Sequence, residues 1–289
     1  MSWPIVCAGS AMFDDTTTPY GRREGVPGGS LVYASLAARR YAPVRAVGIV
    51  GNDGRSAIVN RLAASGVNID DIEVVEGPTF REHSIHDYHT GSVIIERSEP
   101  GVYSDWEPKL SPPAAMAPAL FVGSMDPRIQ LAILTQSRAS LKAMDSMMMH
   151  INNRREEVLQ VAVHADMAFL NEEEMGELVG TGKGWRRQAE GLLGRGRMRA
   201  VVVKRGAKGA AYVSTDAFYE FPAISVDRVV DPSGAGDSLA GGFLGACAAA
   251  GRDDEEFAPI GLRAGLQCAA DAISQFGVAG LSRNTDHIS

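Results

Sequence analysis

Short apolar runs alternate with amphipathic stretches along most of the 289-residue chain. Runs such as Ala200–Lys204 have the length and apolar composition of buried strands, and stretches such as Leu31–Arg40 have apolar residues at helical spacing. Parallel strands need a crossover connection, which is usually a helix, so this alternation predicts βαβ units and a mainly parallel sheet. The expected strands are Pro4–Ala8, Val44–Val50, Ala119–Val122, Met167–Leu170 and Ala200–Lys204; the expected helices are Leu31–Arg40 with Ser30 as N-cap, Ser56–Ala64 ended by Gly66, Ile129–Gln136, Arg154–Val163 and Trp185–Leu193.

One region, from Ile72 to Arg97, breaks this rhythm. It has little helical periodicity, it is rich in aromatic and β-branched residues, and Gly77-Pro78 and Gly91 punctuate it with turns. We therefore expect an accessory sheet or lid formed by segments at about 12–20 and 72–97, inserted into a single domain that covers residues 1–289. No linker, internal repeat or low-complexity tract argues for a second domain.

Three histidines in this region, His83, His86 and His89, raise the question of a metal site. Successive side chains of a strand point to opposite faces, so His83 and His89 would share one face and His86 would point to the other. Three ligands could not converge without a bend. The pattern favours roles on the lid surface or in substrate contact.

Composition excludes several classes of function. The formal net charge of −7 gives no basic footprint for nucleic acid and no attraction to anionic membranes. The three cysteines, Cys7, Cys247 and Cys268, form neither a C-x-x-C pair nor a disulfide framework. The first residues lack the pattern of a signal peptide, and no apolar stretch is long enough to span a bilayer. We therefore expect a cytoplasmic protein whose partners are small molecules.

The segment Asp231-Pro232-Ser233-Gly234-Ala235-Gly236-Asp237 carries the strongest chemical signal. Its small residues allow a ligand to approach the backbone, and free amides at the first turn of a helix favour an anion. A carboxylate at the same position can accept the proton of an attacking hydroxyl. Phosphoryl transfer needs these two functions side by side. The alternative for a shorter glycine pattern would be a helix start capped by an aspartate.

This segment resembles the second signature, D-T-x-G-A-G-D, of the ribokinase-like (PfkB) family of carbohydrate and nucleoside kinases, with Pro232-Ser233 as the departure. The resemblance extends over nearly the whole chain. It implies a three-layer α/β/α fold with a mainly parallel central sheet and a small β-sheet lid. By the resemblance, Asp237 is the catalytic base, and the amides of Gly234, Ala235 and Gly236 form the anion hole.

On the acceptor side, Asp14 follows the first strand in Gly9–Asp14, where the resemblance implies a carboxylate that binds substrate hydroxyls; an Asx turn is the alternative. Gly28, Gly29 and Ser30 resemble the family's Gly-Gly substrate motif, and a plain helix entry is the alternative. Tyr33 stands where sugar kinases of the family usually carry an Asn, which argues against a simple ribose-type substrate. Arg81 is expected to contact the acceptor from the lid.

On the nucleotide side, Asn171 and Glu174 resemble the N-x-x-E motif, whose Glu binds Mg²⁺ through water; a solvated helix start is the alternative. Lys204, Gly206 and Gly209 resemble the nucleotide-phosphate loop, with a basic β-turn as the alternative. Ala269 lies in a segment, 269–280, that resembles the helix and loop covering adenine and, in several members, coordinating a monovalent cation such as K⁺. A packed C-terminal helix is compatible with both interpretations.

These residues predict an ATP- and Mg²⁺-dependent kinase of a small sugar or polyol, with a nucleoside as the alternative acceptor and Asp237 as general base. The resemblance also implies a homodimer through the lid. Two other classes remain to be tested: a catalytically silent sugar-binding protein on the same fold, and a nicotinamide-dependent enzyme. The second needs a glycine fingerprint after the first strand, which Gly9-Ser10-Ala11 does not supply.

Overall fold

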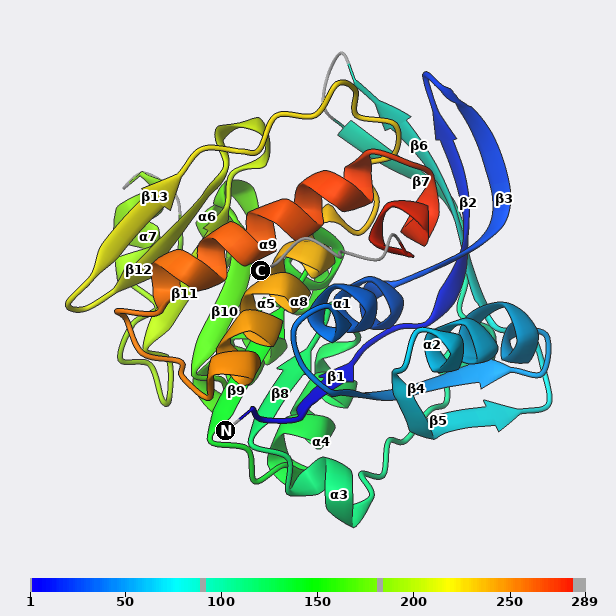
Figure 1. Ribbon diagram of the computed structural model, residues 1–289, viewed down its shortest axis with the longest axis horizontal. Helices are drawn as coiled ribbons and strands as arrows, with labels where there is room; N and C mark the ends of the chain where they lie inside the picture. Colours follow the sequence, from blue (N-terminus) through cyan, green and yellow to red (C-terminus); the bar gives the residue numbers. More distant parts are fainter. Residues whose placement is uncertain (1, 89–91, 181–183, 283–289) are drawn as a thin grey trace.

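The computed structural model describes residues 2–88, 92–180 and 184–282. Its centre is a nine-stranded sheet with the order β13-β12-β11-β10-β9-β8-β1-β4-β5 (Figure 1). Seven neighbouring strands of this sheet, β11-β10-β9-β8-β1-β4-β5, are parallel. The hairpin strands β12 and β13 extend the sheet in antiparallel pairing. The strands are β1 Ile5–Ala8, β4 Val44–Gly51, β5 Asn68–Val75, β8 Ala119–Val122, β9 Leu141–Asp145, β10 Met167–Asn171, β11 Ala200–Lys204, β12 Ala210–Ser214 and β13 Phe218–Phe221.

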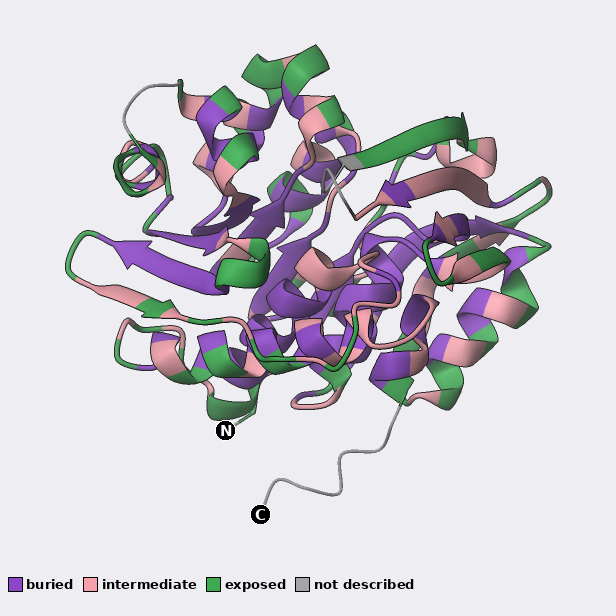
Figure 2. Cartoon of the chain, turned by 90° about the horizontal axis from the view of Figure 1, so that it is seen from above, coloured by how far each residue is buried: buried purple, intermediate pink, exposed green. Residues whose placement is uncertain are grey.

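Helices cover both faces of this sheet, as the predicted three-layer architecture requires, and each face has its own hydrophobic core. The residues of the inner strands are almost entirely buried (Figure 2) because helices pack against both sides, whereas the edge strands β5 and β13 are mostly half-buried or exposed. One layer contains α1 Ser30–Arg39, η1 Arg55–Val59, α2 Asn60–Ala64, α8 Ala235–Ala250, α9 Ala258–Ile273 and η4 Gly277–Ser282; the other contains α3 Pro112–Ala115, α4 Pro127–Gln136, α5 Met148–His164, α6 Glu172–Val179 and α7 Trp185–Glu190.

A separate four-stranded sheet, which we call the lid, has the order β3-β2-β6-β7. It consists of two antiparallel hairpins, and β2 pairs with β6 in parallel. The edge strand β7 is largely exposed (Figure 2). The predicted lid is thus confirmed. Its strands are β2 Met12–Thr18, β3 Gly21–Gly28, β6 Phe80–Asp87 and β7 Ser92–Glu99, and η2 Gly101–Tyr103 follows them.

Several local expectations differ from the structure. Residues 72–75 belong to β5 of the large sheet, and β3 adds a lid strand beyond residue 20, because β-type sequence does not state which sheet a strand joins. Gly29, and not Ser30, is the N-cap of α1; Ser30 is the first helical residue. The expected end at Gly66 is found, with a left-handed φ of 78°. His89 lies outside the described residues.

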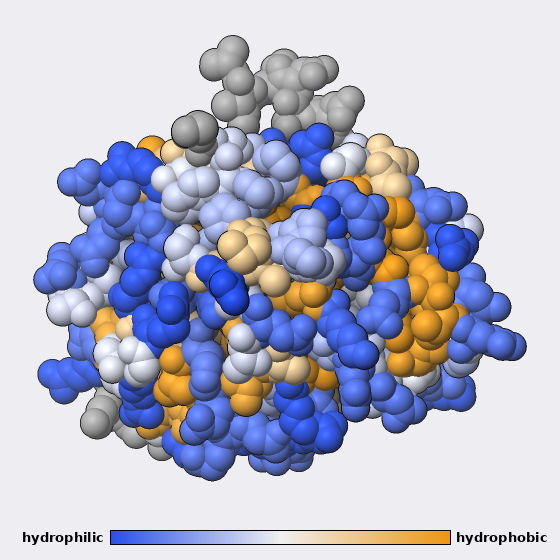
Figure 3. Space-filling view, turned by 90° about the horizontal axis from the view of Figure 1, so that it is seen from below, coloured by the Kyte–Doolittle hydropathy of each residue, from blue (hydrophilic) through white to orange (hydrophobic). Residues whose placement is uncertain are grey.

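No helix within the described residues is both long and apolar enough to cross a bilayer. Figure 3 shows one face of the molecule as mainly hydrophilic, with hydrophobic side chains gathered in separate patches. The long apolar helix α8 is instead sandwiched inside the protein. Its residues from Ser238 to Ala248 are buried, and it packs against both α1 and α9.

Glycines allow α8 to approach α1 more closely than side chains would permit. A Cβ atom on Gly241 would lie 2.4 Å from the carbonyl oxygen of Ala34, and one on Gly245 would lie 2.8 Å from the Cα of Ala38. These neighbours are backbone atoms, which cannot rotate away. The small residues of α8 therefore set the distance between the two helices and, with it, the position of the helix N-terminus.

We expect Gly241→Ala to lower the free energy of unfolding, measured by urea denaturation. Helix propensity alone favours Ala over Gly by about 1 kcal/mol, so it offsets part of the expected loss. Overpacking against fixed backbone costs about 1–3 kcal/mol, and the 2.4 Å contact places this site at the upper end. Ala249→Ser, at an exposed position of the same helix, should change stability by less than about 0.5 kcal/mol. A Gly241→Ala protein as stable as the parent would contradict the packing argument.

Candidate active site

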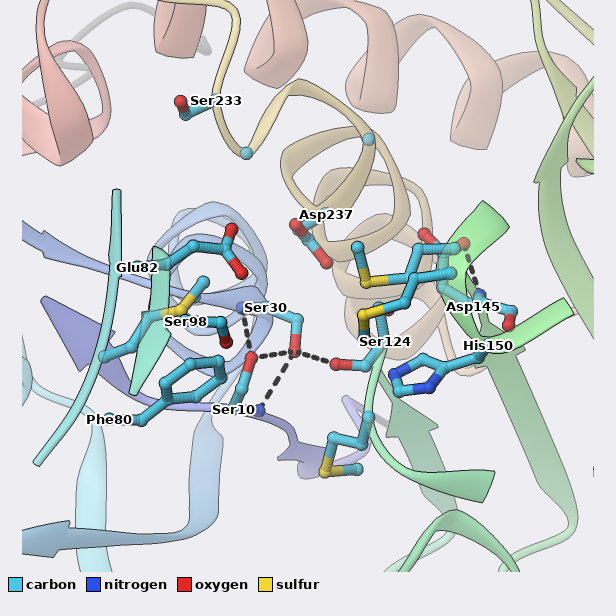
Figure 4. Close-up of a pocket in the computed structure, with 18 of the residues that line it drawn as sticks. Ser10, Ser30, Phe80, Glu82, Ser98, Ser124, Asp145, His150, Ser233 and Asp237 are labelled. Atoms are coloured by element: carbon cyan, nitrogen blue, oxygen red, sulfur yellow. Dashed lines mark hydrogen bonds between the residues drawn. The ribbon is translucent and has the colours of Figure 1, made fainter. Parts of the chain in front are cut away.

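A cavity of about 780 Å³ opens between the lid and the carboxyl ends of the parallel strands. Ligands of open α/β sheets bind at this edge, because successive strands deliver their following residues to one crevice. Ser10 follows β1, Ser124 follows β8, Asp145 ends β9 and Lys204 ends β11, and all four line the cavity. Figure 4 shows Ser10, Ser124 and Asp145 around it. The sheet edge thus gathers residues that are far apart in the sequence.

The start of α8 forms another wall of this cavity, with Gly234, Gly236 and Asp237 exposed to it. Gly234 is the N-cap residue and has a left-handed φ of 69°. A Cβ atom there would lie 2.2 Å from the ring of Tyr33, so only glycine fits against this buried aromatic side chain. No side chain caps the helix start. The Ala235 amide donates to the Pro232 carbonyl at 3.3 Å, so the amides of Gly234 and Gly236 are the ones left available to a ligand. Ala235 is the first residue of α8 and does not line the cavity.

Asp231 fixes the turn that precedes α8. Its carboxylate is buried and accepts hydrogen bonds from the amide of Ser233 (3.0 Å) and from the amide of Gly277 in η4 (2.9 Å). The first aspartate of the segment therefore has a structural task, whereas Asp237, on the first turn of the helix, faces the open cavity (Figure 4). Burial raises the pKa of Asp237 to about 6, although Lys204 acts in the opposite direction.

Lys204 is held by two carboxylates. Its Nζ lies 2.7 and 2.9 Å from the two oxygens of Asp145 and 3.6 Å from Oε2 of Glu174. Burial acts to lower the pKa of Lys204, but Asp145 and Glu174 outweigh it and raise this pKa above its usual value. A Cβ atom on Gly236 would lie 3.3 Å from Nζ, so the ammonium group lies beside the first turn of α8.

Asn171 and Glu174 form a capping box at the start of α6. The side-chain oxygen of Asn171 accepts from the Glu174 amide at 2.8 Å, and Oε2 of Glu174 accepts from the Asn171 amide at 2.7 Å. This arrangement is the structural alternative for the N-x-x-E motif, yet Glu174 also lines the cavity. Asn171 itself does not line the cavity.

Four of the five acceptor residues expected from sequence, namely Asp14, Gly28, Gly29 and Ser30, lie at one corner, and all of these except Gly28 line the cavity. Asp14 and Gly28 are so close that a Cβ atom on Gly28 would overlap the Asp14 carboxylate, 1.8 Å from Oδ2. Gly29 and Ser30 line the cavity, and the Ser30 hydroxyl joins Ser10 and the carbonyl of Ser124 in a hydrogen-bond network (Figure 4). Burial raises the pKa of Asp14 well above its usual value, and the nearby carboxylate of Glu82 adds to this effect.

Arg81 does not reach the cavity. Its guanidinium pairs with Asp15 at 3.0 Å and stacks over Phe13, on the face of β6 opposite to the one that carries Phe80 and Glu82. The placement differs from the sequence expectation because alternation along the strand, and not charge, decides which residues face a ligand.

Three residues expected to bind nucleotide lie away from the cavity. Gly206 begins η3 with a left-handed φ of 55°, and Gly209 packs so tightly that a Cβ atom would lie 2.0 Å from the Phe221 carbonyl. Ala269 lies on α9, against the core of that helix layer. Their assignment to nucleotide binding stays a prediction.

Sequence reasoning missed several residues that line the cavity. Asp145 ends β9, a strand that was not predicted, and its pairing with Lys204 joins positions far apart in the chain. Glu82 could have been found by counting every second residue from Phe80 along the lid strand. Phe80 and Tyr103 stack with ring centres 5.6 Å apart at an interplanar angle of 22°. No sequence pattern announces that stacking.

The model of the pfkB family of carbohydrate kinases matches residues 6–284. The chain belongs to this family. It is therefore an ATP-dependent phosphotransferase of the ribokinase type. A cytidine kinase of Thermococcus kodakarensis is 29% identical over 280 residues, which cover 94% of this chain and 97% of the relative.

Solved structures of other kinases have the same fold as this chain. A ribokinase from Cryptococcus neoformans in complex with ADP has a TM-score of 0.80 and 21% identity, and the match covers 98% of both chains. A nucleoside kinase of Methanocaldococcus jannaschii has a TM-score of 0.76 and 21% identity, and the match covers 95% of this chain and 92% of that one.

We expect Lys204→Met to lower the free energy of unfolding by about 3–5 kcal/mol, because it leaves the buried Asp145 carboxylate without its cation. The double variant Lys204→Met/Asp145→Asn should lose much less than the sum of the two single changes. The control is Lys208→Met, which changes an exposed lysine in η3, just after β11. It should lower the free energy of unfolding by less than about 0.5 kcal/mol in urea denaturation. Additive losses in the double variant would show that the pair is not coupled.

Proposed function

We propose that this kinase transfers the γ-phosphoryl group of ATP to a hydroxyl of a small sugar or polyol, with Asp237 as general base. The observation that carries the proposal is the position of Asp237, on the first turn of a helix whose start lines the same cavity. The acceptor lies between the lid and the sheet edge, where Asp14, Gly29 and Ser30 contact its hydroxyls. The phosphates lie at the start of α8.

In this mechanism Asp237 accepts the proton of the attacking hydroxyl, which attacks the γ-phosphorus in line with the leaving oxygen of ADP. The amides of Gly234 and Gly236, the two residues of this turn that line the cavity, hold the charge on the phosphoryl oxygens. Lys204 adds a fixed positive charge beside the same helix turn. The lid excludes water, which would otherwise compete as the acceptor.

The donor set fits Mg²⁺ held mainly by phosphates. The described residues contain no group of three or more His, Cys, Asp or Glu side chains that could hold a metal ion by themselves. Glu174 is buried at the cavity wall, where its carboxylate could bind Mg²⁺ through water. When bound, the cation would neutralise phosphate charge and orient the γ-phosphoryl group.

A nucleoside is the second candidate acceptor. The stacked rings of Phe80 and Tyr103 line the cavity and offer an aromatic surface to a base. The relative from Thermococcus kodakarensis is named a cytidine kinase, and a nucleoside kinase is among the similar structures. A panel of sugars, polyols and nucleosides tested for ADP release distinguishes these acceptors. Release stimulated by none of them would support a silent binding protein.

We expect Asp237→Asn to lower kcat by about 10²–10⁴-fold, because loss of a general base typically has this cost. ATP binding, measured by isothermal titration calorimetry, should persist, since the amides of α8 remain. The matched control is Asp231→Asn, whose carboxylate anchors the turn and should affect stability as well as turnover. Retained turnover in Asp237→Asn would remove Asp237 from the mechanism.

The reaction should depend on pH through the ionisation of Asp237. The base acts as the carboxylate, and burial raises its pKa to about 6. We therefore expect kcat/KM for the acceptor to be low at pH 5, to rise through about pH 6 and to level off above pH 7. In Lys204→Met the rise should move to higher pH, because the opposing positive charge is gone. A flat profile between pH 5 and 7.5 would contradict the assignment.

A further inference from the structure

The face of the lid that lines the cavity is acidic. Every second residue of β6 faces the cavity, namely Phe80, Glu82, Ser84 and His86, whereas Arg81 and His83 lie on the opposite face beside Asp15. In Figure 4, Glu82 extends from the lid into the same space that Asp237 enters from α8. Glu82 therefore belongs to the wall of the acceptor half, although no motif marks it.

Glu82 lies directly beside Asp14. The two residues are partners in the parallel pairing of β2 with β6, so their side chains point to the same face from strands about 4.8 Å apart. Within the described residues neither carboxylate forms an ion pair or accepts a hydrogen bond from the protein. The result is two adjacent carboxylates that open toward the cavity.

The permanent cations that line the described part of the cavity do not compensate this pair. Lys204 is committed to Asp145 and Glu174. Arg154 is committed to Asp126, at 2.8 Å. The acceptor half therefore keeps the negative charge of its own wall, and a bound nucleotide adds more negative charge at the other end of the cavity.

Two buried polar atoms independently indicate that a polar ligand enters here. The Nδ1 atom of His86 and the hydroxyl of Tyr33 have no hydrogen-bond partner within the described residues. Both side chains line the cavity and are more than nine-tenths buried, with exposed fractions of 8% and 1%. Buried polar atoms are normally satisfied, so unpartnered ones beside a cavity point to groups supplied by a ligand.

We propose that Glu82, paired with Asp14, is a specificity-determining residue that restricts the acceptor to neutral or amine-bearing polyhydroxy compounds and rejects anionic ones. The proposal rests on the proposed function and narrows its substrate class. Burial raises the pKa of both carboxyl groups, so the charge argument applies at alkaline pH, where both are ionised. Ionised carboxylates only accept hydrogen bonds, so the ligand between them must bring O–H or N–H donors. A carboxylate or phosphate on the acceptor would meet two like charges in a partly desolvated site.

The test compares acceptors that are matched in shape and differ in charge. The sets, assayed at pH 8, are glucitol with gluconate, glucose with glucosamine, ribitol with ribonate, and uridine with orotidine. For whichever neutral member reacts, we expect kcat/KM of its anionic counterpart to be lower by at least about tenfold. The amine-bearing compound should react at least as well as the neutral one. Comparable rates for neutral and anionic acceptors would overturn the proposal.

Glu82→Gln tests the residue itself, because it keeps the shape and removes the charge. The ratio of kcat/KM between anionic and neutral acceptors should rise by about tenfold. Glu96→Gln, an exposed acid on the lid strand β7, changes the net charge equally and should leave the ratio unchanged. An equal shift in both variants, or none in Glu82→Gln, would overturn the proposal.

Two further measurements separate the remaining explanations. If the neutral probes bind in calorimetry but receive no phosphoryl group, the proposed function fails, and their binding relative to the anionic probes still decides the charge selectivity. If no probe binds, the selectivity proposal fails too. The melting temperature of Glu82→Gln at pH 8 should match or exceed that of the parent, because a repelling charge is removed. A clear decrease would assign Glu82 a structural role instead.

Discussion

The close approach of α8 to α1 and the sheet edge is the constraint on which the site depends. Bare amides stabilise a phosphate only if the helix N-terminus lies in the crevice where the strands end. Gly241 allows the backbone contact with Ala34. Gly234 has no side chain, so the ring of Tyr33 can pack directly against its backbone. Asp231 then ties the preceding turn to η4. Packing thus places the amides, and one anchored turn keeps their direction.

Charge placement around this helix start follows from the same geometry. A buried lysine beside the amides would be costly alone, and two carboxylates hold it ionised. That cation in turn opposes the effect of burial on Asp237, so the pKa of this acid stays near 6. A carboxyl group with this pKa is ionised at neutral pH and still basic enough to share a proton with an attacking hydroxyl.

The sequence predicted the layers and the helix start because both depend on local patterns. Apolar runs mark buried strands, as for Ala200–Lys204, and small residues before Asp237 mark a helix whose amides are free. The pairing of Lys204 with Asp145 was not predictable, because it depends on the order of strands in the sheet. The lid face was misjudged for a different reason: Arg81 was chosen for its charge, whereas strand parity directs Glu82 to the cavity.

The two ends of the cavity differ in electrostatic character, and this difference bears on the acceptor. The phosphate end presents amides and a fixed cation, whereas the lid presents Asp14 and Glu82 side by side. A neutral acceptor carrying hydroxyls can satisfy the lid carboxylates only with the donor-rich part of its ring against them. That orientation leaves another hydroxyl to face Asp237 from the opposite side. Under the proposed function, the lid carboxylates would therefore orient the acceptor as well as select it, because reversing the ligand would leave buried acceptor atoms without donors.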